Sequence, residues 1–434
     1  RGRFAVLKPY MANMLERALP HWGKEELHTA QFENGFRVIY KHVDRPVTHC
    51  GLVINAGTRD EIDAHGEAGV AHFIEHTLFK GTQNRKAFHV LNRLDSVGGE
   101  FNAYTSKEDT WIYAAFSEQH LERAVELIAD ITFNATFPVN EIKKERDVIL
   151  DELNAYLDSP ADSIFDEFEE KLFEGHPMGG NILGNPDSVR AMNRATIEGF
   201  VARHYHPNEM VFSVVGATPW SKVTRLCEKH FGRIEGGAST LNRTAFEGRA
   251  PFDVRLKKDI HQVHHVMGTL TCGSNHPDRL GLALIANHLG GPTMNNRLSL
   301  NVRERHGMAY NIECAYTPYS DVGVFSVYFG TDKRLHKRAE ALVRKELAAL
   351  RKTKLGVRQL HSIKQQIVGH VALSQDSGSS VMTSLGKSFL LYNRVERLET
   401  VFEAIEAITA DDVLRLANEV LDDRTWSHLV YSNA

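Results

Sequence analysis

Residues 66–82 read GEAGVAHFIEHTLFKGT, and the pentapeptide HFIEH within them brings His72, Glu75 and His76 together. The apolar period of this stretch predicts a helix over residues 69–79. Residues four positions apart lie on the same face of a helix, so His72 and His76 could hold one tetrahedral metal ion from the same side. Glu75 flanks that face, where its carboxylate could accept a proton from a water molecule at the metal. The stretch therefore predicts a catalytic zinc site.

Two histidines do not complete a catalytic zinc site, which uses three protein ligands and one open position. A third ligand is offered by residues 141–158, in which Glu145, Ile149, Glu152 and Tyr156 follow a 4-3-4 spacing and share one helical stripe. Carboxylates on such a partly apolar stripe are costly to bury without partners. The stripe predicts Glu152 as the third ligand and Glu145 as a hydrogen-bond partner that orients a ligand. The chain has 23 His, so the pentapeptide alone also fits a chance arrangement, and the acidic stripe is what favours a metal.

The rest of the chain alternates between strand-like and helix-like patterns, which indicates an α+β fold. Strands are predicted in the β-branched and aromatic stretches 36–40, 50–55 and 211–215. Further helices are predicted over Leu121–Phe133 and Val139–Leu157. The polar segment 235–251 lacks periodicity and predicts a linker between an N-terminal catalytic half, residues 25–234, and a C-terminal half, residues 252–434.

The two halves show a faint internal repeat. In the second half, a predicted strand at residues 263–269 is followed by a predicted helix that carries Leu284, Asn287 and His288. Aligning His288 with the second His of the pentapeptide puts Asn287 in place of Glu and Leu284 in place of the first His. The second copy would thus lack the base and one ligand, so the metal chemistry is predicted for the first half only.

A second histidine-rich stretch contains His261, His264 and His265, whose HxxHH order imitates a metal motif. Its surroundings predict a strand, in which residues three apart point to opposite faces. We therefore predict an ordinary structural role for these histidines.

Composition narrows the class of protein. A formal net charge of −4 argues against nucleic acid as a partner, and no run of about 18 apolar residues predicts a membrane span. Residues 1–10 lack the features of a secretory signal, although the chain does not begin with Met, so a leader could have been removed. We expect a cytoplasmic protein of the bacterial type, in which the four separated cysteines are buried thiols: Cys50, Cys227, Cys272 and Cys314.

From about Thr29 to its end, the chain resembles the pitrilysin family of zinc metallopeptidases, the inverzincins with the HxxEH order. This family includes insulin-degrading enzymes, the mitochondrial processing peptidase and smaller bacterial relatives. The resemblance rests on residues 66–82, on GGEFNAYTSKEDTWIY at 98–113, and on ERDVILDE at 145–152, which ends at the family's third ligand position, Glu152. It implies one zinc ion held by His72, His76 and Glu152.

The resemblance extends to RERHGMAY, residues 303–310. In members that cut peptides, an Arg and a Tyr at this spacing reach from the C-terminal half toward the active site; here they correspond to Arg303 and Tyr310. Their implied role is to hold the substrate backbone and stabilise the oxyanion. Substrate would lie along an edge strand whose implied contact residues are Phe101, Asn102, Ala103 and Thr105. For Asn102, a turn or solvent role remains the alternative.

The family fold implies two homologous halves, each of two similar α/β-sandwich domains, that close like a clam-shell around a chamber. Members of this length pair as homodimers, with a heterodimer as the alternative. The implied function is a zinc-dependent endopeptidase acting on peptides or unfolded segments. The alternative is a non-catalytic or partner-dependent subunit of the same fold, a reading that the retained site residues disfavour.

Overall fold

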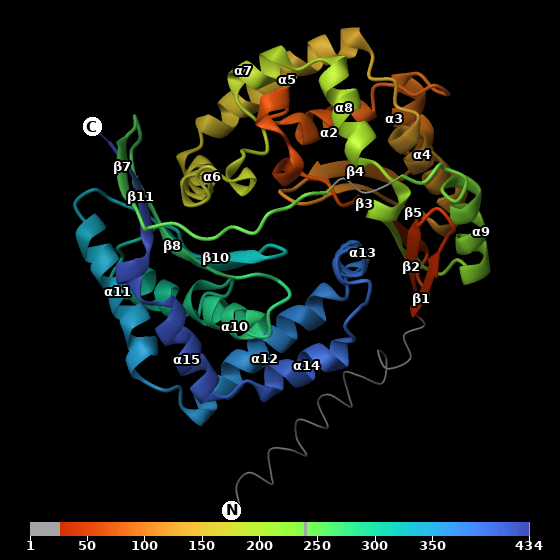
Figure 1. Cartoon of the computed structure of the whole chain (residues 1–434). Helices are drawn as coiled ribbons and strands as arrows, with labels where there is room; N and C mark the ends of the chain where they lie inside the picture. The colour runs from red at the N-terminus through yellow and green to blue at the C-terminus, as the bar shows by residue number, and fades with distance from the viewer. Residues whose placement is uncertain (1–26, 238–240, 434) are drawn as a thin grey trace, which may run out of the picture.

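The computed structural model of the chain describes residues 27–237 and 241–433, and it contains one sheet in each half (Figure 1). The predicted absence of a signal in residues 1–10 falls outside the described residues. The first sheet has six strands in the order β1-β2-β6-β3-β5-β4. Their bounds are β1 Leu27–Gln31, β2 Arg37–His42, β3 Val47–Ile54, β4 Glu100–Thr105, β5 Thr110–Ser117 and β6 Met210–Gly216.

The second sheet has five strands in the order β7-β11-β8-β10-β9. Their bounds are β7 Asp253–Lys257, β8 Val263–Cys272, β9 Ile312–Pro318, β10 Val322–Thr331 and β11 Ser427–Ser432. When β1 is left out, the strands of the first sheet follow the same order along the sheet as those of the second. In each sheet the first pair, β2 with β6 and β7 with β11, is parallel, and the remaining pairs are antiparallel. The faint repeat in the sequence is therefore a repeat of topology, with β3 and β8 at equivalent positions.

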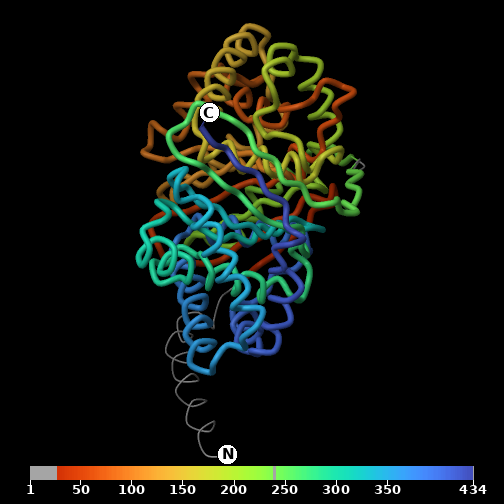
Figure 2. Tube along the Cα trace, turned by 90° about the vertical axis from the view of Figure 1, so that its left-hand side faces the viewer, coloured from red at the N-terminus to blue at the C-terminus, as the bar shows by residue number. Residues whose placement is uncertain are grey.

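Helices surround both sheets, and Figure 2 shows the first half above the second from another side. The first half contains α2 Val70–Leu78, α3 Ala87–Asp95, α4 Leu121–Phe133, α5 Val139–Leu157, α6 Pro160–Leu172, α7 Pro186–Ala191, α8 Arg194–His204 and α9 Trp220–His230. The second half contains α10 Arg279–Gly290, α11 His336–Lys352, α12 Val357–Ser374, α13 Gly378–Tyr392, α14 Leu398–Ala407 and α15 Ala410–Val420. Among the described residues, no helix is both long and apolar enough to span a bilayer.

The two halves exchange a helix. Helix α13 of the second half packs on strands β3 and β6 of the first sheet, while α6 of the first half packs on β8 and β11 of the second sheet (Figure 1). Met382 and Leu385 of α13 are buried with Val53 and Val211 of the first sheet. The opposite face of that sheet packs on the helices of its own half. Each sheet is therefore covered on both faces, which explains why a strand such as β6 is apolar at nearly every position.

The structure confirms the α+β class and the two matching halves, and it corrects one part of the expectation. Each half contains one sheet with its helices, not two sandwich domains. A half of this size builds a single hydrophobic core on each face of its sheet, and the second face is filled by the exchanged helix. The described residues of segment 235–251 form no helix or strand.

A buried ion-pair network joins the halves. Arg59, which is 4% exposed, donates to Glu108 of the first half at 2.7 Å and to both carboxylate oxygens of Asp321 in the second half at 2.8 and 2.6 Å. Its guanidinium also donates to the carbonyl of Thr244 in the connecting segment. Burial of so many charges is tolerated only because each has a partner.

We expect Arg59→Ala to lower the free energy of unfolding by about 3–5 kcal/mol, because it leaves Glu108 and Asp321 without their cation. The matched control is Arg45→Ala, which removes a pair with Asp376 that also joins the halves but is exposed, and which should cost less than about 1 kcal/mol. Urea unfolding followed by circular dichroism measures both changes. Equally small losses would contradict a structural role for the buried network.

Candidate metal centre

Contacts at its N-terminus hold helix α2 in place. It begins after Gly69, whose φ of 83° lies in the left-handed region, and a Cβ there would come within 2.8 Å of Gly184 Cα. The carboxylate of Glu61 accepts hydrogen bonds from the N–H groups of Gly69 and Ala71, so it satisfies N–H groups that the start of a helix leaves unpaired. The apolar side of α2 is buried in the hydrophobic core between the first sheet and the helices of its own half. This packing points the other side, with His72 and His76, at helix α5.

The structure brings His72, His76 and Glu152 together, with one potential ligand atom of each within 4.8 Å of the others. Glu152 Oε2 lies 3.4 Å from His76 Nε2 and 3.8 Å from His72 Nε2. Burial and the neighbouring His76 lower the pKa of His72 to about 4, so its ring is neutral near pH 7 and keeps a free lone pair. Two imidazoles and one carboxylate form the ligand set of a catalytic zinc site with an open position.

Glu145 lies behind this triad, as the helical stripe predicts. It is 5% exposed, and its Oε2 lies 3.1 Å from His76 Nδ1. Its Oε1 lies 2.7 Å from Lys80 Nζ. A carboxylate cannot donate, so His76 carries its proton on Nδ1 and presents the lone pair of Nε2 toward Glu152. This orientation fits a metal at the triad.

We expect Glu145→Ala to weaken zinc binding by about 10–100-fold, because His76 loses the acceptor that holds its ring and tautomer. Titration with a fluorescent zinc chelator as competitor measures the change. Asp147→Ala, an exposed carboxylate on the same helix, is the control and should leave the affinity unchanged. An unchanged affinity in Glu145→Ala would show that the ring of His76 is held by packing alone.

Glu75 stands next to the triad and is held by strand β4. The hydroxyl and the backbone of Thr105, His76 and Glu152 all lie close enough to the Glu75 carboxylate to affect its pKa, while the Thr105 hydroxyl also donates to the carbonyl of Ala71 at 3.4 Å. Burial raises the pKa of Glu75 above its ordinary value, and the bonds from Thr105 oppose that rise. A partly buried carboxylate with a raised pKa is suited to accept and return a proton.

Strand β4 forms the edge of the first sheet, because β5 is its only neighbour among the described strands. Phe101 packs against Phe79 just beyond α2, Asn102 is exposed and Ala103 is buried. The N–H of Ala103 donates to the side chain of Asn102 at 2.8 Å, so it points away from β5, toward the open edge. The edge position agrees with the expected substrate strand, whereas the contacts of these residues with a substrate remain a prediction.

Arg303 and Tyr310 lie together in the second half. They line one cavity of about 550 Å³ with Met308 and Ala309, and no described residue of the metal triad lines it. Arg303 belongs to a π-helical turn, Ser299–Glu304, a rare conformation that is frequent at functional sites. Its Nε donates to Glu304, and Tyr310 is 79% exposed. The pair therefore faces solvent and is available to a group outside its own fold.

The sequence patterns did not identify two charged residues near the triad, Lys80 and Glu61. Lys80 follows His76 by four positions, which is the helical spacing that would have suggested a shared face. Glu61 lies in a loop before the helix, and no periodic signal links it to Gly69 and Ala71.

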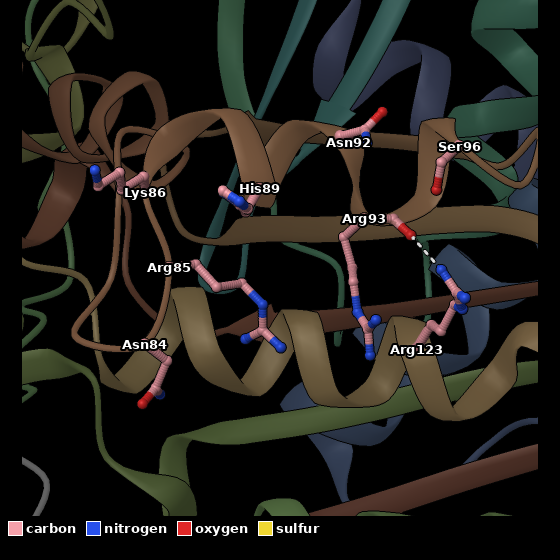
Figure 3. Close-up of a pocket in the computed structure, with 8 residues that line it drawn as sticks. All are labelled: Asn84, Arg85, Lys86, His89, Asn92, Arg93, Ser96 and Arg123. Carbon is pink, nitrogen blue, oxygen red and sulfur yellow. Dashed lines mark hydrogen bonds between the residues drawn. The ribbon is translucent and has the colours of Figure 1, made fainter.

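A basic cleft of about 480 Å³ lies between helices α3 and α4, away from the triad (Figure 3). Arg85 donates to Glu126 and Asp130, and Arg93 donates to Glu126, so acidic residues neutralise much of the positive charge of the cleft. Arg123 donates to the carbonyl of Arg93. These bonds give the three arginines of the cleft a structural role.

The chain is similar to known proteins over most of its length. Residues 37–186 match the family described as Insulinase (Peptidase family M16), and residues 191–367 match Peptidase M16 inactive domain. An uncharacterized zinc protease of Mycobacterium leprae is 32% identical over 395 residues, which cover 90% of this chain and 88% of the relative. The uncharacterized zinc protease YmxG of Bacillus subtilis is 30% identical, over 90% of this chain and 95% of the relative.

Solved structures share the fold. A protease from Helicobacter pylori has a TM-score of 0.86 at 23% identity and covers 94% of this chain and 100% of its own. A peptidase M16 inactive domain from Pseudomonas fluorescens has a TM-score of 0.86 at 19% identity, over 94% of this chain and 98% of its own. With the extent and identity of the matches above, the chain belongs to peptidase family M16, the insulinase family.

Proposed function

We propose that this protein is a zinc-dependent endopeptidase that cleaves extended peptides or unfolded segments. The observation that carries the proposal is the convergence of His72, His76 and Glu152 beside Glu75 and the edge strand β4. This arrangement would put metal ligands, a general base and a peptide-binding edge in one region. Relatives named zinc proteases support the choice of metal.

In this proposal, His72, His76 and Glu152 hold Zn²⁺, which when bound polarises a peptide carbonyl and lowers the pKa of a neighbouring water. Glu75 accepts a proton from the attacking water and returns it to the nitrogen of the leaving amine. Thr105 lies beside the Glu75 carboxylate and opposes the rise of its pKa. A substrate strand pairs with the open edge of β4, where the Ala103 N–H exchanges its bond to Asn102 for one to the peptide.

Arg303 and Tyr310 complete the proposed site from a second copy of the chain. Two features support this arrangement: Tyr310 is largely exposed, and the cavity of the pair is separate from the triad of its own chain. In a homodimer each pair would face the metal of the other copy across an enclosed chamber. The guanidinium of Arg303 and the hydroxyl of Tyr310 would then donate to the substrate backbone and to the oxyanion.

Chelation tests the proposal most directly. A mixed peptide library should be cleaved at internal bonds, cleavage should stop after removal of metal, and zinc should restore it, since the chemistry needs the metal and its water. Mass spectrometry identifies the products. Cleavage that survives the chelator would rule out a metallopeptidase. A zinc-loaded chain that cleaves no peptide would instead favour the non-catalytic or partner-dependent subunit.

A further inference from the structure

A second group of metal-ligating side chains lies in the other half of the molecule. His265 Nδ1 is 3.0 Å from His336 Nε2, and His265 Nε2 is 3.1 Å from His428 Nδ1. One potential ligand atom from each of His265, His336 and Glu340 lies within 4.8 Å of the other two. Two nitrogens bound to one tetrahedral zinc ion are about 3.3 Å apart, so the spacing of the first two rings is close to that of ligands.

Three elements build this cluster. His265 lies in strand β8, opposite Val430 of β11, which puts His428 two residues away on the same face. His336 is the first residue of helix α11, and Glu340 follows one helical turn later on the same side. The cluster is unrelated to the internal repeat, because the position equivalent to the first triad lies on helix α10.

The three histidines are buried. His265 is fully buried, and His336 and His428 are 7% and 8% exposed. Burial lowers the pKa of all three rings, so each is neutral near pH 7 and keeps one nitrogen lone pair. By contrast, His264 bonds the hydroxyl of Tyr328. That contact fits the structural role predicted for the HxxHH stretch.

A chain of hydrogen bonds among the three rings would satisfy their nitrogens, but it leaves the carboxylate of Glu340 unexplained. Arg344 donates two hydrogen bonds to Oε1 of Glu340, at 3.0 and 2.8 Å. Neither of these bonds uses Oε2, the other carboxylate oxygen. Arg344 also pairs with Asp423, so one guanidinium serves two carboxylates. Two further cations are near the rings: Arg255, which is paired with Asp253, and Lys337, which is exposed.

We propose that His265, His336 and Glu340 bind a second divalent cation, of which Zn²⁺ is the best match. Nδ1 of His265, Nε2 of His336 and a carboxylate oxygen of Glu340 would be the ligands. His265 would then carry its proton on Nε2 and donate it to His428, the bond that orients most metal-bound histidines. In this tautomer His428 carries its own proton on Nε2, so its 3.4 Å contact with the guanidinium of Arg344, which can only donate, would have to open when the cation binds.

This site would be structural. Glu340 would itself be a ligand, and the carboxylate of Asp423 is paired with Arg344, so neither would act as a base beside the cation. The cation would tie helix α11 to β8 and, through His428, to the C-terminal strand β11. The proposal does not depend on the peptidase activity, because it uses none of the residues of the first triad.

Metal counting tests the proposal on the full chain after dialysis against a zinc buffer. We expect about two zinc ions per chain in the wild type and about one in His336→Gln, which keeps a hydrogen-bonding side chain at that position. His76→Ala removes a ligand of the first triad and should also bind about one ion, and the double variant should bind none. Equal zinc in wild type and His336→Gln would overturn the proposal. If the first triad binds no zinc but the second site does, His76→Ala has the same zinc content as the wild type, while His336→Gln still loses its ion.

A second readout guards against misfolding of the variants. In the His76→Ala background, zinc should raise the thermal midpoint, and the further change Glu340→Gln should remove that increase. Glu403→Gln, an exposed carboxylate on α14, is the matched control and should keep it. A midpoint that zinc does not move in His76→Ala would also overturn the second site.

Discussion

Glu75→Gln should abolish peptide cleavage while the protein keeps its zinc. An amide has nearly the same shape as the carboxylate and can still accept the bonds from Thr105, so the helix and the triad should stay in place. It cannot accept a proton from water, and the loss of a general base typically costs about 10²–10⁴-fold in rate. Cleavage of a quenched fluorescent peptide gives kcat/KM, and elemental analysis gives the zinc content.

The control for this substitution is Glu403→Gln, which makes the same chemical change on the surface of α14 and should leave both quantities unchanged. Full activity in Glu75→Gln would remove Glu75 from the mechanism. Loss of zinc together with loss of activity would mean that Glu75 is needed to build the site, which would also contradict the assigned role.

Two inactive chains should restore each other when they form a mixed dimer. Glu75→Gln lacks the base, and Arg303→Ala lacks a donor to the oxyanion, whose loss typically costs about 10²–10³-fold. If Arg303 acts on the metal site of the other copy, the mixed dimer contains one intact site. Its activity should therefore be about half that of the wild-type dimer, since a two-fold dimer has two equivalent sites. Purification through a different tag on each chain isolates the mixed species.

The reciprocal pairing is the control. A dimer of wild type with the double variant Glu75→Gln, Arg303→Ala should be inactive, because its only base faces the substituted Arg303. If Arg303 acted within its own chain, the two results would be reversed. Failure to recover any mixed dimer through both tags would contradict the homodimer itself.

Much of the first triad was predictable because its parts are local. The spacing within HFIEH and the stripe from Glu145 to Tyr156 follow from helical geometry, and α2 and α5 have the ranges that this geometry requires. Their meeting could be inferred from chemistry, since the buried carboxylate of Glu145 needs a partner. The structure adds the partner that periodicity did not reveal, the Lys80 ammonium group on its other oxygen.

The histidines of the second half show the opposite case. His265 and His336 are 71 residues apart, and His428 is 163 residues from His265. A strand pattern predicts which face each residue takes, but it does not say which helix covers that face. The HxxHH spacing was therefore informative about the strand and uninformative about the ring nitrogens that meet there.

The sequence alone determined several of the helices and strands, the repeat of the two halves and the shared face of His72 and His76, because periodicity and residue spacing act over a few turns of chain. Only the tertiary structure decided that α6 and α13 cross to the other half's sheet, and that Arg303 and Tyr310 share a cavity apart from the triad. Contacts of this kind depend on which apolar faces meet across hundreds of residues. Many pairings bury similar apolar area, and the complete packing of both sheets selects one of them.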